Sequence, residues 1–370
     1  MHSASCLVNS YDERCTMHDE REDGGEMKAA VYLGKESIEI KEVDKPKVKK
    51  GEILVKVHSC AICGTDVRTY FHGHHAIKPP HILGHEVAGE IAEIGEGVEG
   101  YKQGERIHMV TEVGCGKCKF CIEGRHNLCP ELKAMAYYYP GGFAEYILIP
   151  YQGVIQGNLL PIPEGLSFDE ATLAEPLSCC INAQEYLNVV SGETVVVAGA
   201  GPIGCMHAEL ARLSGAAKII LADISQERLT MGKKFGANIF VNSTKEDLVD
   251  RVKSETEKRG ADVVIVACPD PRAQEQALQM IATRGRISFF GGLPAGKTIT
   301  IESNIVHYKE ISIFGAFASF AAQYRRALEL LASKKINGDD LITHRFPLEK
   351  IKEALEVARS GKGLKVIVKP

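Results

Sequence analysis

Residues 195–204 read VVVAGAGPIG, an apolar run typical of a buried strand that continues directly into the pattern G-x-G-x-x-G and then into a helical pattern. In such a turn the first glycine permits the tight bend, the second lets a pyrophosphate approach the backbone, and the third lets the helix pack on the strand. The amides at the start of that helix favour an anion. The segment therefore predicts a dinucleotide-binding turn. Its expected cofactor contacts are Gly199, Gly201, Pro202, Ile203 and Gly204.

An acidic residue downstream of the glycines indicates which dinucleotide binds. Asp223 ends the next predicted strand, 19 residues after Gly204. A carboxylate there accepts hydrogen bonds from the ribose hydroxyls of NAD and repels the additional phosphate of NADP, so NAD is the predicted cofactor. The competing interpretation of Asp223 is a helix-entry cap before Ser225. Arg228 is a candidate cofactor contact that would weaken the preference if it turned toward the ribose.

The pattern of apolar and polar residues changes along the chain. From about residue 191, short apolar runs alternate with amphipathic stretches, which is typical of parallel strands connected by helices, so residues 178–315 are predicted to form a doubly wound α/β domain. Residues 27–155 are rich in β-type runs broken by glycine and proline, which indicates a compact barrel-like domain. Residues 1–26 are polar and acidic without a periodic apolar face, and we expect a disordered tail there.

Composition excludes several classes of function. The 370 residues are 45% hydrophobic and 25% charged with a net charge of -4, and no basic block is dense enough to follow a phosphate backbone, so nucleic acid is not an expected partner. No apolar run approaches the roughly 20 residues needed to span a bilayer, and the N-terminus lacks a signal-peptide pattern. The twelve cysteines favour a reducing compartment, so we expect a cytoplasmic protein.

Four cysteines lie within fifteen residues, with the spacing C-x2-C-x2-C-x7-C. Thiolates at this spacing can converge on one tetrahedral ion, and a closed four-sulfur zinc site stabilises the fold without leaving a position for substrate. The competing interpretation is a disulfide framework, which suits a small secreted protein better. The spacing predicts a structural zinc held by Cys115, Cys118, Cys121 and Cys129.

A second set of potential ligands comes from distant segments: Cys63, His85, Glu86 and Glu175. Such mixed sites usually keep one position open, and an open zinc acts as a Lewis acid that lowers the pKa of a bound hydroxyl. Taken singly, Cys63 could be a small core residue, His85 a hydrogen-bonded core histidine and Glu175 a helix-initiating acid. Together with a nucleotide fold and a four-cysteine lobe, they predict a catalytic zinc.

These motifs together resemble the zinc-dependent medium-chain alcohol dehydrogenase superfamily, with closest similarity to its polyol (sorbitol or L-iditol) and threonine dehydrogenase branch. The resemblance covers nearly everything from Met27 to Pro370. It implies a GroES-like catalytic domain made of residues 27–177 and 316–370, with a Rossmann domain between them. The matching motifs are Cys63-Gly64-Thr65-Asp66, Gly84-His85-Glu86, the 115–129 lobe, Gly141-Gly142-Phe143-Ala144-Glu145-Tyr146, Ala174-Glu175-Pro176-Leu177 and the glycine turn.

The resemblance also implies roles for individual residues. Cys63 and His85 would be zinc ligands, with Glu86 and Glu175 as ligands directly, through water or in exchange. Thr65 would hydrogen-bond the substrate hydroxyl and begin proton removal, although a turn-capping hydroxyl is the alternative. Asp66 would orient His85, since ligating histidines commonly need such a partner.

Two positions depart from the family pattern. Many relatives carry a relay histidine where this chain has Arg68, which stays charged and cannot shuttle protons. We expect Arg68 to bind a cofactor phosphate or an anionic substrate group instead. Polyol dehydrogenases tend to place an arginine after a Gly-x-Phe segment, whereas Ala318 follows Gly315-Ala316-Phe317 here. A less polar pocket is expected at that point, which disfavours sorbitol itself.

The function predicted from sequence is oxidation of a secondary alcohol of the polyol type to a ketone, with two zinc ions per chain and NAD as hydride acceptor. Thr65, Glu86 and Arg68 are the candidate catalytic residues. One alternative is amino alcohol oxidation like that of L-threonine 3-dehydrogenase. Another is a non-catalytic NAD-binding sensor, which would not need an open metal position. The resemblance implies a homotetramer or homodimer.

Overall fold

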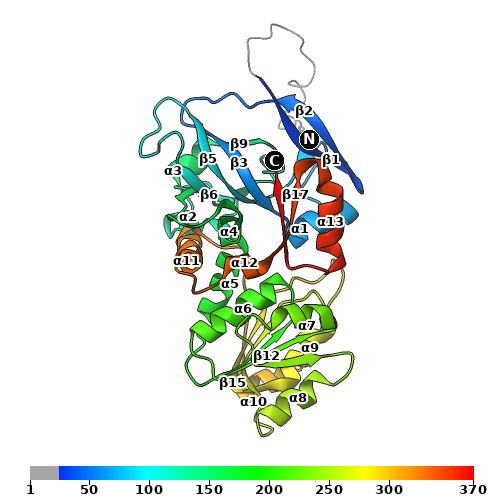
Figure 1. Ribbon diagram of the computed structural model, residues 1–370. Helices are drawn as coiled ribbons and strands as arrows, with labels where there is room; N and C mark the ends of the chain where they lie inside the picture. Colours follow the sequence, from blue (N-terminus) through cyan, green and yellow to red (C-terminus); the bar gives the residue numbers. More distant parts are fainter. Residues whose placement is uncertain (1–24) are drawn as a thin grey trace, which may run out of the picture.

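The computed structural model describes residues 25–370, so the tail predicted for residues 1–26 lies almost entirely outside the described part. The chain forms two lobes joined side by side (Figure 1). Within the described part, no helix is both long and apolar enough to cross a membrane.

The first lobe is built mainly of antiparallel sheet. Its strands are β1 (Glu26–Gly34), β2 (Ser37–Asp44), β3 (Ile53–Ala61), β4 (His81–Ile82), β5 (Glu86–Ile94), β6 (Arg106–Met109), β7 (Glu112–Val113), β8 (Lys133–Ala134), β9 (Tyr146–Ile149) and β10 (Leu159–Pro161). Its helices are α1 (Gly64–His72), α2 (Lys119–Ile122), the 3-10 helix η2 (His126–Leu128), α3 (Tyr151–Ile155), α4 (Phe168–Thr172) and α5 (Ala174–Leu187).

The second lobe alternates strands with helices. It contains β11 (Thr194–Ala198), α6 (Pro202–Leu213), β12 (Lys218–Asp223), α7 (Gln226–Gly232), β13 (Ile239–Asn242), α8 (Leu248–Glu255), β14 (Ala261–Val266), α9 (Pro271–Met280), β15 (Ile281–Phe289), α10 (Ser303–Lys309) and β16 (Ser312–Gly315). The six strands are parallel in the order β13-β12-β11-β14-β15-β16. This order is that of a doubly wound nucleotide-binding sheet, which confirms the predicted fold class.

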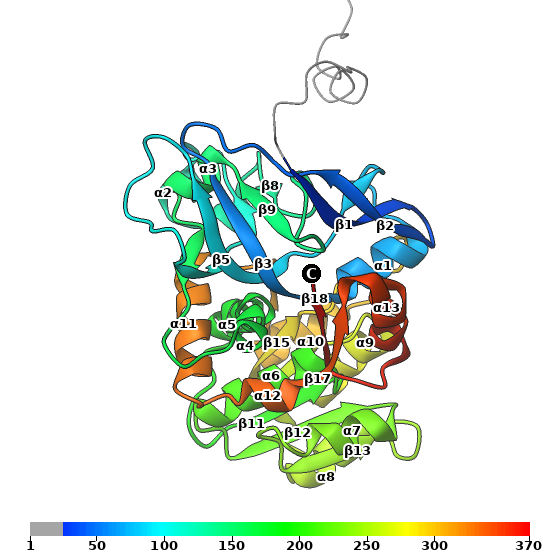
Figure 2. The ribbon, with the colours of Figure 1, turned by 45° about the horizontal axis from the view of Figure 1, so that its top comes forward.

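The chain then returns to the first lobe. Its last elements are α11 (Ala321–Ala332), α12 (Gly338–Leu341), β17 (Ile342–Pro347), the 3-10 helix η3 (Leu348–Lys350), α13 (Ile351–Ser360) and β18 (Lys365–Lys369). In both views the red C-terminal segment lies against the blue N-terminal half (Figures 1 and 2). Strand β18 pairs antiparallel with β3, so the C-terminus completes the main sheet of the first lobe.

The local sequence explains the nucleotide turn. All five residues of β11 are buried, as expected for a central parallel strand. Pro202 occupies the first turn of α6, where its missing amide hydrogen leaves no bond unmade. Gly199 has a φ of 112°, a backbone conformation that other residues rarely adopt. The predicted strand, turn and helix are therefore all present.

The two lobes share an apolar core. One buried cluster includes Ala88 of β5, Leu177 of α5, Met206 of α6 and Tyr324 of α11. Helix α5 runs without interruption across the predicted domain boundary at residues 177/178. Close packing between the lobes holds the glycine turn in a defined position relative to the predicted metal ligands.

Candidate active site

The four clustered cysteines converge as the spacing predicts. The sulfur atoms of Cys115, Cys118, Cys121 and Cys129 all lie within 4.8 Å of one another. The ten cysteines of the described residues are free thiols, so the disulfide alternative does not hold for this lobe. A Cβ atom on Gly114 would lie 2.5 Å from the Cys121 sulfur, which explains why the loop has glycine there.

The donor set of this lobe fits a zinc ion. Hydrogen bonds from the backbone of Lys117 and Cys118 lower the pKa of Cys115 to about 7. Burial raises the pKa of Cys121 to about 12. A bound divalent cation favours the thiolate form of every coordinating sulfur, and four sulfurs fill a tetrahedral shell. Zinc at this site would therefore be structural.

Three of the four residues predicted for the second site also come together. Ligand atoms of Cys63, His85 and Glu86 lie within 4.8 Å of one another. Cys63 follows β3 and precedes α1, while Glu86 begins β5. Strands β3 and β5 pair with Ala61 opposite Glu86, so the antiparallel register brings the two segments together.

Glu175 is not a member of this group of three. It lies in the first turn of α5 and is buried, and it accepts a hydrogen bond from the Cys179 thiol at 3.6 Å. Its charge nevertheless reaches Glu86, whose pKa is raised to about 7 by burial, lowered in part by Lys365, and raised further by Glu175. Glu175 therefore acts on Glu86 through its charge, although its own oxygen atoms are not among the ligand atoms that converge with Cys63 and His85.

A buried carboxylate oxygen indicates that the group of Cys63, His85 and Glu86 would hold a cation. Glu86 Oε1 is buried and has no hydrogen-bond partner among the described residues. A buried carboxylate oxygen without a partner is costly, and a metal ion would remove that cost. Sulfur, imidazole and carboxylate donors together suit zinc.

Asp66 holds both ligand segments in place. Its carboxylate accepts hydrogen bonds from the amides of Cys63, at 2.9 Å, and Gly84, at 3.2 Å. One of its oxygens also lies 3.8 Å from His85 Nδ1. This arrangement agrees with the predicted orienting role, because one side chain ties the start of α1 to the segment that carries His85.

Sequence reasoning missed Lys365 and Glu112. Lys365 Nζ makes an ion pair with Glu86 and donates to the Ile62 carbonyl at 3.0 Å. Glu112 accepts a hydrogen bond from the Tyr324 hydroxyl at 2.9 Å, and burial, together with the charge of Glu175, raises its pKa to about 8. The only sequence signal for Glu112 is its position three residues before Cys115, and no sequence signal marks Lys365.

The predicted cofactor contacts at residues 199–204 form the glycine turn itself. A Cβ on Gly204 would lie 1.7 Å from the Gly199 carbonyl oxygen, so helix and strand could not pack as they do with any other residue. A Cβ on Gly201 would meet nothing within 4 Å, which leaves open space where the pattern predicts a pyrophosphate. Pro202 and Ile203 begin α6 behind this space.

Asp223 is positioned by the backbone of the turn. Its carboxylate accepts from the amide of Ala200 at 2.7 Å and from that of Ser225 at 2.8 Å. The second bond matches the alternative of a local cap, but each carboxylate oxygen has a further lone pair for a ribose hydroxyl. Arg228 lies toward the other lobe, since a Cβ on Gly361 would be 2.7 Å from its Nη2 atom.

A cavity of about 400 Å³ opens at the carboxyl ends of β15 and β16. Helix α5 runs from Glu175 to this cavity, because Glu175, Cys179, Asn182 and Tyr186 follow one another at helical spacing. The lining residues are Asn127, Leu128, Asn182, Tyr186, Phe289, Phe290, Gly292, Gly315, Ala316 and Phe317. Two of these residues, Asn127 and Asn182, donate to the Phe317 carbonyl at 2.7 and 3.5 Å, so the less polar pocket expected at this point stays a prediction.

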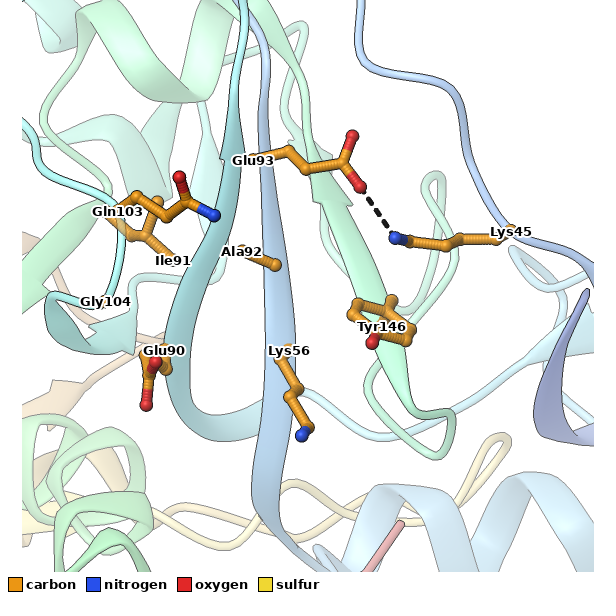
Figure 3. A pocket seen from close by; sticks show the side chains of 9 residues that line it. All are labelled: Lys45, Lys56, Glu90, Ile91, Ala92, Glu93, Gln103, Gly104 and Tyr146. Carbon is orange, nitrogen blue, oxygen red and sulfur yellow. Dashed lines mark hydrogen bonds and ion pairs between the residues drawn. The ribbon is translucent and has the colours of Figure 1, made fainter. Parts of the chain in front are cut away.

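A second hollow, of about 590 Å³, lies over the strands of the first lobe (Figure 3). Lys45 and Glu93 form an ion pair of 2.6 Å across it, and Lys45 also lies over the Tyr146 ring at 4.5 Å. None of the predicted site residues is among those that line it. Its open, charged walls do not contribute to the candidate active site.

The fold and the two ligand groups define a zinc-dependent oxidoreductase that uses a nicotinamide dinucleotide. The model of the alcohol dehydrogenase GroES-like domain matches residues 49–163, and that of the zinc-binding dehydrogenases matches residues 202–333. The chain belongs to the zinc-dependent medium-chain alcohol dehydrogenase superfamily.

Individual relatives agree with this assignment. L-threonine 3-dehydrogenase of Pyrococcus horikoshii is 37% identical over 89% of this chain and 94% of its own length. Sorbitol dehydrogenase of Bacillus subtilis is 35% identical over 93% and 97%, respectively. A zinc-binding dehydrogenase of Sinorhizobium meliloti, solved bound to NADP, superposes with a TM-score of 0.87 at 31% identity, over 94% of this chain and 100% of the other.

Proposed function

We propose that the protein oxidises a secondary hydroxyl of a polyol or related small alcohol to a ketone, with NAD as hydride acceptor, and that it runs in reverse with NADH. The convergence of Cys63, His85 and Glu86 beside Thr65 carries this proposal. These three side chains would hold the catalytic zinc, and Cys115, Cys118, Cys121 and Cys129 the structural one. Glu175 would join the catalytic set through water or in exchange.

Each chain residue has a defined task in this scheme. Bound zinc would supply Lewis-acid polarisation of the substrate oxygen, and NAD would accept the hydride. Thr65 accepts a hydrogen bond from the substrate hydroxyl and passes the proton on to solvent water, releasing its own hydrogen as it takes the new one; its side chain is only partly buried. Glu86 balances charge beside the substrate, while Lys365 holds that carboxylate in place.

Arg68 takes no proton in this scheme. It is exposed at the surface of α1, and one of its nitrogens donates to Thr65 Oγ1 at 2.9 Å. A guanidinium has five donor hydrogens, so the others remain available for a cofactor phosphate or an anionic substrate group. We therefore retain anion binding as its proposed role.

NAD is the proposed dinucleotide because Asp223 places a carboxylate at the end of β12, beside the glycine turn. The NADP bound to the Sinorhizobium meliloti structure indicates that this fold also accepts the phosphorylated form. The ratio of kcat/KM for the two dinucleotides tests the preference, and a higher value with NADP would overturn it.

L-threonine 3-dehydrogenase activity is the second candidate, since the relative with that name shares 37% identity. A panel of pentitols, hexitols, inositols, short diols and L-threonine, followed at 340 nm with NAD, separates the two. A polyol as the best substrate supports the first proposal, and L-threonine as the best substrate supports the second. Family membership favours either enzyme over the non-catalytic sensor.

We also propose that residues 27–177 with 316–370 form the catalytic domain and residues 178–315 the dinucleotide domain, although the boundary falls inside α5.

A homodimer or homotetramer is proposed because the edge of the six-stranded sheet is open. Strand β16 ends the six-stranded sheet, no residue of α10 is buried, and Tyr308 is 77% exposed. Light scattering at micromolar concentration measures the molar mass and so tests the proposed association.

A cytoplasmic location is proposed because the cysteines of the described residues are free thiols, which suits a reducing compartment.

A further inference from the structure

Two buried asparagines hold the segment of residues 315–318, the wall segment, whose first three residues line the cavity of about 400 Å³. Asn127 Nδ2 donates to the Phe317 carbonyl at 2.7 Å, and Asn182 Nδ2 donates to the Ala318 carbonyl at 2.8 Å. The two asparagines are 4% and 3% exposed, respectively. Side-chain amides from elements far apart in the sequence therefore hold two consecutive carbonyls of the wall segment.

The backbone of the wall segment needs this support. Ala318 has a φ of 48°, a left-handed conformation that is costly for a residue with a side chain. Phe317 is 62% exposed, so packing around its ring holds the segment only weakly. Strained backbone persists where surrounding contacts fix it, and it is concentrated at ligand sites. The hydrogen bonds from the two asparagines are contacts of this kind.

The four-cysteine lobe holds Asn127 in place. Asn127 is the middle residue of η2, which ends directly before Cys129, a member of the four-sulfur group. The Cys129 amide donates to the His126 carbonyl at 3.0 Å, which closes the turn that carries Asn127. Arg125 precedes this turn, and its guanidinium lies over the Phe320 ring at 5.6 Å. The lobe therefore contacts the chain after β16 at two places.

The cavity lies at the edge of the sheet where the dinucleotide is expected. Ligands of open α/β sheets bind outside the carboxyl ends of the strands, and β15 and β16 end side by side there, with Phe289 opposite Gly315. Asp223 ends β12, on one side of β11 and its glycine turn, whereas β15 and β16 lie on the other side. With the adenosine end at Asp223, the nicotinamide end extends toward the cavity. Phe290 and Phe317 offer a flat ring aromatic surface there.

We propose that Asn127 is a positioning residue for the dinucleotide: its hydrogen bond to the Phe317 carbonyl keeps the wall segment in the shape that receives the nicotinamide end. The inference requires dinucleotide binding and does not depend on which alcohol is oxidised. Asn127 takes no part in proton or hydride transfer. The four-cysteine lobe then contributes to cofactor binding as well as to folding.

Titrations of Asn127→Ala with NADH and with ADP-ribose test the proposal, because ADP-ribose lacks only the nicotinamide ring. The dissociation constant of NADH should rise about threefold to tenfold, as expected for the loss of one hydrogen bond. That of ADP-ribose should stay within about twofold of wild type, because its contacts are at the glycine turn and Asp223. Zinc content should not change. A general loss of structure would instead weaken both ligands equally.

Asn158→Ala is the matched control for the loss of a buried asparagine. Asn158 is 1% exposed, and its Nδ2 also donates to backbone carbonyls, those of Val110 and Glu112, at 3.2 and 2.8 Å. It does not line the cavity, so its variant should be less stable yet keep both dissociation constants within about twofold of wild type. A rise of less than about threefold for NADH in Asn127→Ala overturns the proposal. So does an equal weakening of ADP-ribose, or the same loss in Asn158→Ala.

Hydrogen exchange of the wild type provides a readout that does not require a variant to fold. NADH should slow exchange in the peptide that covers the wall segment more than ADP-ribose does, since only NADH brings a ring to the cavity. Equal protection by the two ligands would overturn the inference. Conversely, a wild type with this difference in protection that oxidises none of the panel alcohols would refute the proposed function and still support the inference.

Discussion

Glu86 and Lys365 form an ion pair inside the protein in which the side chains are 0% and 3% exposed, respectively. They lie 279 positions apart, and the pairing of β18 with β3 brings them together. Buried charges are costly unless they are paired, so Lys365 allows a carboxylate to be kept beside Cys63 and His85. The C-terminal strand thus contributes directly to the candidate active site.

Lys365→Met should destabilise the protein by about 3–5 kcal/mol in urea unfolding, because it leaves the Glu86 carboxylate buried without its partner. The control is Lys369→Met, whose partner Asp169 keeps hydrogen bonds from Arg345 and Ser59, so a loss of only about 0–1 kcal/mol is expected. Adding Glu86→Gln to Lys365→Met should recover part of the loss. An unfolding free energy for Lys365→Met within about 1 kcal/mol of wild type would contradict the assigned role.

Glu112 should make stability depend on pH. Its folded pKa of about 8 lies above its ordinary value of 4.5, so between these pH values the folded state holds a proton that the unfolded state releases. The contribution of this group to the free energy of unfolding therefore falls as pH rises, by up to about 1.4 kcal/mol per unit.

Glu112→Gln removes this titration and keeps a polar partner for Tyr324. Relative to wild type, the variant should be markedly more stable at pH 8 than at pH 5, as measured by urea unfolding. The exposed Glu99→Gln serves as control and should follow the wild-type profile. Parallel profiles for Glu112→Gln and wild type would show that Glu112 does not titrate in this range.

Cys121→Ser should reduce bound zinc from about two ions per chain to about one, because it removes a ligand from a closed four-sulfur shell. Limited proteolysis should then cut within the lobe of residues 115–129. Cys268→Ser, in the nucleotide lobe, should retain the full zinc content measured by elemental analysis. An unchanged content in Cys121→Ser would argue against a metal in this lobe.

Gly204→Ala and Gly201→Ala should separate folding from cofactor binding. The first places a methyl group 1.7 Å from the Gly199 carbonyl oxygen and should lower the melting temperature in the absence of cofactor. The second meets open space, so its melting temperature should match wild type. NADH titration should nevertheless show roughly tenfold weaker binding to Gly201→Ala, because the methyl group occupies space that the pyrophosphate needs. Wild-type affinity in Gly201→Ala would place the dinucleotide elsewhere.

Asp223→Asn should shift the ratio of kcat/KM for NAD over NADP by about tenfold toward NADP, since the amide does not repel the additional phosphate. The single amide oxygen can replace only one of the two carboxylate oxygens that accept from Ala200 and Ser225, so the melting temperature of the variant should be measured beside the ratio. Asp270→Asn, which retains the helix cap of α9, is the control and should leave the ratio unchanged. A ratio unaffected by Asp223→Asn would favour the local-cap interpretation of this residue.

The parts of the site that sequence predicted well are short-range. The glycine turn and the four-cysteine lobe each occupy ten to fifteen consecutive residues, where backbone geometry alone restricts what the residues can do. The apolar run at the start of residues 195–204, expected to be a buried strand, forms β11 (Thr194–Ala198) in the structure. Cys63, His85 and Glu86 were grouped from their donor chemistry and from the nucleotide fold and cysteine lobe in the same chain, because no local spacing relates residue 63 to residue 85.

By itself, the sequence determined the doubly wound fold, the cysteine lobe and the kind of donor atoms available, because these depend on neighbouring residues and on side-chain chemistry. Only the tertiary structure decided that Glu175 stands outside the group of three and that Lys365 neutralises Glu86. Those relationships depend on strand register and lobe packing, which join residues tens to hundreds of positions apart. A linear pattern carries no record of such distances.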